Sequence, residues 1–196
     1  GFKSGGFVTT TLTNGLPDEY GPENLVAYEA GGKTQWLDRR MTLNAAAFFY
    51  DFEDLQVSRT VVENDRVTVE VDNAAKAEIY GLDVELGWQA MERFSVSAGA
   101  VWLPKREFVD FDGHVTDETL TGNELVRSPE WTATGAIEYE HPLGQIGGLS
   151  ARLEYSYRSG YFYTPDNDPA FSQDAFGLLN LFLRFEAAKE GWYLFA

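Results

Sequence analysis

Aromatic rings and carboxylates stand close together in residues 161–168, which read YFYTPDND. Aromatic faces could pack on a catecholate or another flat ligand, so Tyr161 and Tyr163, with the neighbouring Asp166, are candidate ligand-binding residues. His114 is a further candidate, because an imidazole in a long acidic segment could contact a metal chelate. A solvated surface loop with the same composition is the alternative, and the sequence leaves it open.

Other chemistry finds less support in the residue types. Residues 110–113 and 166–168 resemble parts of calcium-binding loops but lack the complete D-x-D-x-D-G-x₅-E ligand set. The chain has no cysteine and two histidines, and its carboxylates have no base, nucleophile or oxyanion donor at diagnostic spacing. We therefore predict no enzymatic activity, no cofactor and no metal site. A net charge of −16 argues against nucleic-acid binding.

The elements that would position these residues show a period of two. In residues 149–158 every second side chain is apolar, and the side chains between them are serine, arginine or glutamate. Residues 82–89, 94–102, 131–140 and 179–186 repeat this alternation, and residues 41–50 show it less clearly. Alternation over such runs is typical of strands with one apolar face. The sequence therefore predicts an all-β chain.

The connections between these runs alternate in length. Short turns are expected near 38–40, 90–93, 141–148 and 187–191, and long connections near 53–73, 105–127 and 160–174. An up-and-down meander places all short turns at one end of the sheet and all long connections at the other. The long connections carry net charges of −4, −3 and −3, so −10 of the total −16 is expected at one end.

Aromatic residues mark two levels along the expected strands. The pairs Tyr80 with Trp88, Phe94 with Trp102, Trp131 with Tyr139, and Leu149 with Tyr157 are each eight residues apart. Eight residues of strand span about 26 Å, or roughly 20 Å across a membrane when the strand is tilted. Two belts of aromatic residues at this separation are typical of an outer-membrane β-barrel. A soluble β-sandwich, which usually has shorter strands, is the less favoured alternative.

Several motifs, taken in order, resemble the C-terminal β-barrel part of a TonB-dependent outer-membrane receptor of the siderophore-receptor type. The motifs are FKSGGF at 2–7, PENL at 22–25, YEAGGK at 28–33, WLD at 36–38, LNAAAF at 43–48, DFEDLQV at 51–57, NAA at 73–75, GLDVE at 81–85, PEW at 129–131, and the tyrosines at 155 and 157. The resemblance covers nearly the whole chain, and it is carried by the order and spacing of the motifs.

This resemblance implies a 22-stranded barrel closed around an N-terminal plug, to which residues 1–196 would contribute about eight strands. It also implies uptake of an iron–siderophore complex or a similarly scarce ligand, with energy from the TonB complex of the inner membrane. The plug, the contact with TonB and the closing strand would lie outside this chain. The implied partners are outer-membrane lipid, the protein's own plug and a small iron chelate.

The polar face of the expected strands would line the barrel lumen or contact the plug. The residues assigned to this face are Glu29, Lys33, Asp83, Glu85, Arg152, Glu154, Arg158, Arg184 and Glu186. Ordinary polar lining of the lumen and ion pairs with the plug are both open for each of them. A passive porin-like barrel is the first alternative for the whole protein, and a soluble all-β binding module is the second.

Overall fold

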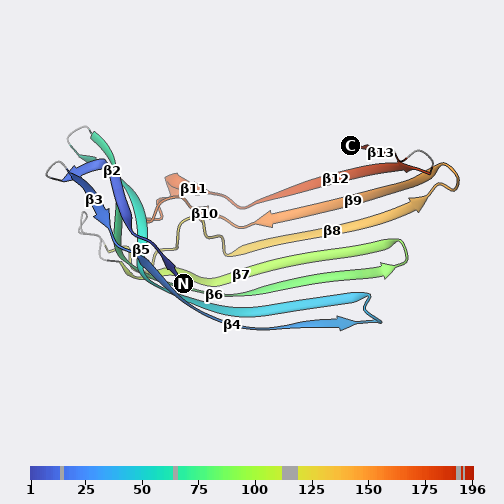
Figure 1. Cartoon of the computed structure of the whole chain (residues 1–196), viewed down its shortest axis with the longest axis horizontal. Coiled ribbons are helices and arrows are strands. Elements are labelled where there is room, and N and C mark those ends of the chain that lie inside the picture. Colours follow the sequence, from blue (N-terminus) through green and yellow to red (C-terminus); the bar gives the residue numbers. More distant parts are fainter. Residues whose placement is uncertain (14–15, 64–65, 112–118, 189–190, 192) are drawn as a thin grey trace.

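The computed structural model describes the backbone of residues 1–13, 16–63, 66–111, 119–188, 191 and 193–196, and the side chains of these residues outside 9–18, 59–70, 72 and 74. The chain forms one curved antiparallel sheet whose long strands lie side by side (Figure 1). The sheet has the order β1-β4-β5-β6-β7-β8-β9-β12-β13. The predicted all-β architecture is therefore confirmed. No helix among the described residues is long and apolar enough to cross a membrane.

The strands of the main sheet follow the chain almost in sequence order. They are β1 (Phe2–Lys3), β4 (Glu23–Trp36), β5 (Met41–Glu63), β6 (Arg66–Met91), β7 (Phe94–Phe111), β8 (Trp131–Pro142), β9 (Gly147–Arg158), β12 (Phe176–Ala187) and β13 (Tyr193–Phe195). Two small hairpins stand apart from it: β2 (Gly6–Thr13) with β3 (Leu16–Tyr20), and β10 (Tyr161–Phe162) with β11 (Ser172–Gln173). A short 3₁₀ helix, Pro169–Phe171, precedes β11.

The short turns gather at one end of the sheet and the longer connections at the other, as the alternating lengths predict (Figure 1). The turn between β4 and β5 is unusually tight. Its residues Leu37, Asp38 and Arg39 all have positive φ angles of 55–68°. This left-handed conformation is costly for residues other than glycine, and the Arg40 N–H stabilises the turn by donating to the Leu37 carbonyl at 3.1 Å.

The prediction of a long connection over 53–73 is wrong. β5 and β6 continue through this segment as a paired hairpin, from Val57 opposite Asp72 to Glu63 opposite Arg66. The segment is rich in valine, whose branched side chain favours extended backbone. Irregular register between Phe52 and Val57, with a positive φ at Asp54, marks where the hairpin departs from the main sheet. β7 likewise extends to Phe111, into the connection expected over 105–127.

Apolar side chains cover one face of the main sheet, which we call the apolar face. Register places Leu153 beside Ile137 and Leu181, and Trp102 opposite both Leu82 and Trp131. The Trp102 and Trp131 rings stack with centroids 5.5 Å apart. Apart from the half-buried Trp102, these side chains are exposed although they are large and apolar; Leu181, for example, is 58% exposed. An apolar face of this extent requires a cover that is itself apolar.

The buried core lies at the end of the long connections. Val57, Ala75, Ala77, Phe108 and Phe111 form a buried cluster. Four partly buried apolar side chains pack against it, those of Phe52, Leu55, Leu120 and Leu125. Among the described residues, the hydrophobic cluster therefore lies at the end of the long connections, whereas the middle of the sheet has one apolar face and one polar face.

Candidate functional site

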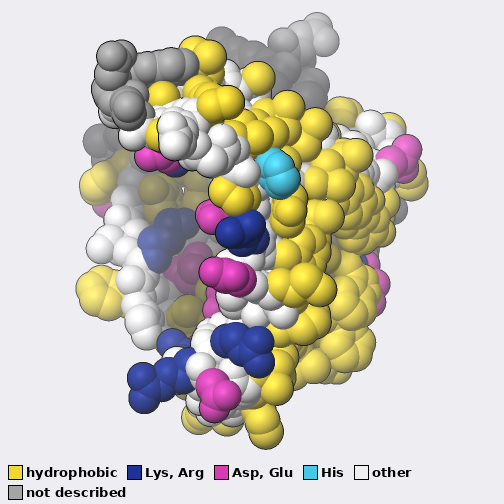
Figure 2. All heavy atoms as spheres, turned by 90° about the vertical axis from the view of Figure 1, so that its right-hand side faces the viewer, with side chains coloured by type: hydrophobic (Ala, Val, Ile, Leu, Met, Phe, Trp, Pro, Cys, Tyr) yellow, Lys and Arg dark blue, Asp and Glu magenta, His cyan; other side chains and the backbone are white. Residues whose placement is uncertain are grey.

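The face opposite the apolar face, which we call the polar face, carries the residues that the sequence assigned to the lumen. The register places Lys33 beside Asn44, and Asn44 beside Glu85. Further along the same face, on β9, Arg152 lies between Glu138 and Phe182, and Arg158 lies between Thr132 and Phe176. Viewed from the short-turn end, the charged side chains surround a hollowed side of the molecule and the apolar ones cover the other side (Figure 2).

Ion pairs on the polar face join neighbouring strands and neighbouring positions on one strand. Arg152 contacts Glu138 at 3.6 Å and Glu154 at 3.0 Å, and Arg184 contacts Glu186 at 3.0 Å. These groups are a third to two-thirds exposed, so each pair contributes at most about 1 kcal/mol. Asn44 donates to Glu85 at 3.2 Å. The guanidinium of Arg158 lies 6.0 Å from the centre of the Phe176 ring.

Hollows on the polar face bring these charges together. One has a volume of about 360 Å³ and is lined by Glu29, Lys33, Asp83 and Glu85 among others. The side chains of Glu29, Lys33 and Asp83 make no hydrogen bond or ion pair with one another or with any other described residue. A second hollow, of about 440 Å³, lies between Glu85 on β6 and the Arg152–Glu154 pair on β9.

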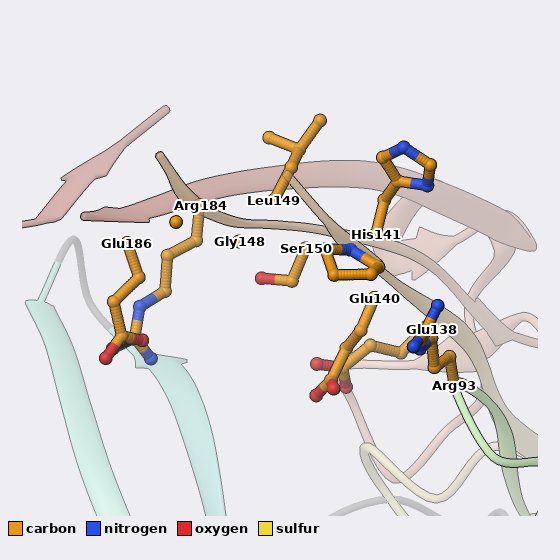
Figure 3. A pocket seen from close by; sticks show the side chains of 11 residues that line it. Arg93, Glu138, Glu140, His141, Gly148, Leu149, Ser150, Arg184 and Glu186 are labelled. Atoms are coloured by element: carbon orange, nitrogen blue, oxygen red, sulfur yellow. Dashed lines mark hydrogen bonds and ion pairs between the residues drawn. The ribbon is translucent and has the colours of Figure 1, made fainter. Parts of the chain in front are cut away.

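A third hollow, of about 300 Å³, lies at the short-turn end. In Figure 3 Arg184 and Glu186 lie side by side at one side of it, and Arg93 lies beside Glu138 and Glu140 at the other. His141 and Leu149 point the opposite way, toward the apolar face. The sequence did not single out Arg93, because it occupies a turn and not a strand with clear alternation.

The predicted ligand-binding tyrosines lie next to each other in the connection between β9 and β12. The Tyr161 and Tyr163 rings meet edge to face with centroids 5.3 Å apart, and their hydroxyl oxygens are 3.4 Å apart. The Arg127 guanidinium lies 5.9 Å from the centre of the Tyr163 ring. The hydrogen bond with Tyr161 raises the pKa of the Tyr163 phenol above its usual value of 10.0. Tyr163 is 43% exposed and therefore accessible from solvent.

The acidic residues that follow the tyrosines build a turn. A carboxylate oxygen of Asp166 accepts from the Asp168 N–H at 3.3 Å, and a carboxylate oxygen of Asp168 caps the 3₁₀ helix by accepting from the Ala170 N–H at 2.8 Å. Asp166 is exposed beyond this contact. Within the described residues, no group of three or more His, Cys, Asp or Glu side chains could hold a metal ion. His114 lies outside the described residues.

Sequence reasoning missed Arg106, the charged residue that is most deeply placed at this end. Arg106 is 9% exposed, and its guanidinium contacts Glu124 at 2.7 Å. In the part of β7 that follows the register shift between Tyr80 and Leu82 of β6, Arg106 and Phe108 are buried while Lys105 and Glu107 are more exposed. Residues 104–110, PKREFVD, do not alternate between apolar and polar side chains, so no signal in the sequence marked a buried arginine in a segment that we expected to be a loop.

A comparison with protein-family models shows to which protein family the chain belongs. The model described as "TonB dependent receptor-like, beta-barrel" matches residues 1–196. The chain belongs to the TonB-dependent receptor β-barrel family. This result confirms the resemblance seen in the motifs and favours the receptor over the porin-like and soluble alternatives. The family is one of receptors, and the absence of an enzymatic role stays a prediction.

Solved structures of siderophore receptors share the fold. The ferric yersiniabactin uptake receptor FyuA from Yersinia pestis matches 95% of this chain with 21% identity and a TM-score of 0.73. The ferric preacinetobactin receptor BauA from Acinetobacter baumannii matches 95% with 16% identity and a TM-score of 0.66. The siderophore receptor PiuA from Acinetobacter baumannii matches 91% with 18% identity and a TM-score of 0.67.

The chain spans only about a quarter of the length of these receptors: 26% of FyuA, 26% of BauA and 24% of PiuA. An open sheet with two unpaired sides is the form that part of a larger barrel wall should have.

Proposed function

We propose that this chain forms part of the wall and of the ligand vestibule of an outer-membrane receptor that takes up an iron–siderophore complex or a similarly scarce ligand. The observation that carries the proposal is the match of the whole chain to the TonB-dependent receptor barrel family. The similarity to receptors whose names specify ferric yersiniabactin and ferric preacinetobactin supports iron chelates as the first substrates to test.

In this proposal the apolar face contacts the hydrocarbon core of the outer membrane. The stacked Trp102 and Trp131 and the exposed Leu153 and Leu181 lie on that face. Tryptophan prefers the boundary between hydrocarbon and headgroups, whereas leucine prefers the hydrocarbon itself. The exposure of these side chains in the isolated chain is thereby accounted for without a protein partner.

The polar face would turn toward the lumen and toward a plug supplied by another part of the protein. Glu29, Lys33 and Asp83 support this orientation, because they line a hollow and lack partners among the described residues. Glu85, Arg152, Glu154, Arg158, Arg184 and Glu186 would line the same lumen. Those already paired, such as Arg152 with Glu138, are better suited to holding the wall together than to holding the plug.

The long connections would form part of the vestibule that the ligand enters first. Tyr161 and Tyr163 present two rings and two hydroxyl groups near the cationic Arg127, an arrangement that suits a flat ligand with acceptor oxygens. Asp166 lies in the turn beside them. We keep His114 as a candidate on its position in the sequence alone.

The test uses the complete receptor that contains this chain, expressed in iron-starved Gram-negative cells. Uptake of radioactive iron from ferric yersiniabactin and ferric preacinetobactin is measured with and without a protonophore, which removes the energy that a TonB complex would deliver. We expect uptake that requires both the receptor and the proton gradient, and receptor that fractionates with the outer membrane. Uptake that is insensitive to the protonophore would favour the passive barrel instead.

A further inference from the structure

A segment between β7 and β8 is fixed onto the extended part of β7. The Phe108 N–H donates to the Asn123 carbonyl at 2.9 Å, and the Leu125 N–H donates to the Arg106 carbonyl at 2.8 Å. Leu120 and Leu125 pack on the buried cluster that contains Phe108. Residues 119–130 are therefore held along a strand and do not stand free in solvent.

Arg106 fixes this segment from within. Its guanidinium donates to the Ser128 carbonyl at 2.7 Å, to the Leu103 carbonyl at 3.2 Å and to the Glu124 carboxylate at 2.7 Å. A planar guanidinium is suited to several simultaneous contacts of this kind, whereas an ammonium is not. Because Arg106 is nearly buried, removing it would leave Glu124 and two carbonyls without their partner.

The next long connection is attached to the first. Asn167 pairs with the backbone of Glu124 in both directions: its side-chain oxygen accepts from the Glu124 N–H at 2.7 Å, and its side-chain nitrogen donates to the Glu124 carbonyl at 3.0 Å. Asn123 donates to the Pro165 carbonyl at 2.9 Å. Arg127 adds a backbone hydrogen bond to the Phe162 carbonyl at 2.8 Å and lies over the Tyr163 ring.

We propose that residues 119–130 and 160–173 form one rigid recognition unit, in which Arg106 is the residue that positions the Tyr161–Tyr163 pair through Glu124 and Asn167. The two connections then respond to a ligand together, and neither closes over it alone. The proposal depends on the proposed function in one respect only, in taking the tyrosine pair as a ligand contact. The coupling itself is a property of the unliganded receptor.

Amide hydrogen exchange of the complete receptor, in detergent and without ligand, tests the coupling. Arg106→Leu should raise exchange roughly tenfold or more in both 119–130 and 160–173. The variant Asn123→Ala/Asn167→Gly, which we call uncoupled because it removes the side-chain links and keeps only the Arg127–Phe162 backbone hydrogen bond and the contact of Arg127 with Tyr163, should raise exchange in 160–173, with a smaller effect on the amides that pair with β7. Glycine suits position 167, where φ is 54°, so this variant removes the amide without adding backbone strain.

Combining the changes separates positioning from general loosening of the fold. If Arg106 acts on 160–173 through Glu124 and Asn167, adding Arg106→Leu to the uncoupled variant should give no further rise there. Additive increases, or an effect of Arg106→Leu confined to 119–130, would overturn the proposal. Arg40→Leu, at the opposite end of the sheet, is the matched control and should leave both segments unchanged. Because no ligand is present, failure of this test says nothing against the uptake function, and failed uptake says nothing against the coupling.

Discussion

The middle of the sheet and its loop end are held together in different ways. From Trp131 to Ala187 the strands β8, β9 and β12 pair without interruption, and their side chains separate by face. The loop end contains irregular register, a buried aromatic cluster and a buried arginine. The middle therefore depends on what surrounds it, whereas the loop end provides its own interior.

This difference reflects the two environments that we propose for the chain, lipid around the middle of the sheet and water around the loop end. In lipid every backbone polar group must be paired within the sheet, but apolar side chains can remain on the surface. Outside the membrane the chain is in contact with water. There a segment stays ordered only if it buries apolar surface or if its polar groups form hydrogen bonds with nearby residues. The substitutions below alter one region at a time, and each has a control in the same region or in the other one.

Phe108→Ala should have the largest effect, and only at the loop end. Phe108 is 1% exposed and stacks on Phe111 with centroids 5.1 Å apart, so its loss should lower the local stability by about 3–5 kcal/mol. Hydrogen exchange should rise in 105–111 and 119–125, while the heat-resistant barrel band on a gel persists. Phe171→Ala, at a 57% exposed side chain, should change neither. Loss of the barrel band would mean that the two regions are not independent.

Leu153→Arg should damage the middle of the sheet and leave the loop end unaffected. A charge in the middle of the apolar face of a membrane strand costs about 2–4 kcal/mol. Arg152→Leu is the matched exchange at the next position, on the polar face, where it removes exposed ion pairs only. Refolding of the complete receptor into lipid vesicles measures both. Equal tolerance of the two variants would contradict the assignment of the faces.

The same difference decides how much the sequence could reveal. Alternation identified parts of β5 to β9 and of β12, their faces and the turn end, because each position in the middle of the sheet needs only one property, apolar or polar. The loop end resisted prediction because its contacts are non-local. Asn167 meets Glu124 across 43 residues, and Arg106 meets Ser128 across 22. Tyr161 and Tyr163 could be singled out because both lie in one short segment, and their role in ligand binding stays a prediction, whereas Arg106 was not singled out.

Replacing Tyr161 and Tyr163 with alanine should weaken uptake without loss of the barrel. The double variant removes the exposed Tyr163 ring, the half-buried Tyr161 ring and the contact with Arg127, and we expect a loss of roughly tenfold in affinity for a bound ferric chelate. Binding of ferric yersiniabactin, measured by quenching of tryptophan fluorescence, is the readout. Tyr161→Phe/Tyr163→Phe keeps the rings and removes the hydroxyls, and so separates stacking from hydrogen bonding. Unchanged binding in both variants would make this segment an ordinary surface loop.

The smallest effect concerns a partly exposed ion pair at the boundary between the two regions. Lys105 lies three residues beyond Trp102 and contacts Glu78 at 2.8 Å and Glu107 at 3.4 Å. The hydrogen bond to Glu78 raises the pKa of the Lys105 ammonium above its usual 10.5. Folding therefore favours the charged form, and the stabilisation is complete below 10.5 and disappears as the pH rises through the higher native pKa.

Lys105→Met should thus lower the free energy of unfolding by about 0.5 kcal/mol near neutral pH, the size typical of solvent-exposed pairs. The difference from the unmodified receptor should vanish at strongly alkaline pH, where the lysine is neutral in both states. Urea unfolding in detergent, followed by tryptophan fluorescence near the Trp102–Trp131 stack, measures it. Lys76→Met is the control, since Lys76 is exposed and has no ion pair among the described residues. A difference that persists unchanged at alkaline pH would show that the aliphatic stem of Lys105, and not its charge, stabilises the boundary.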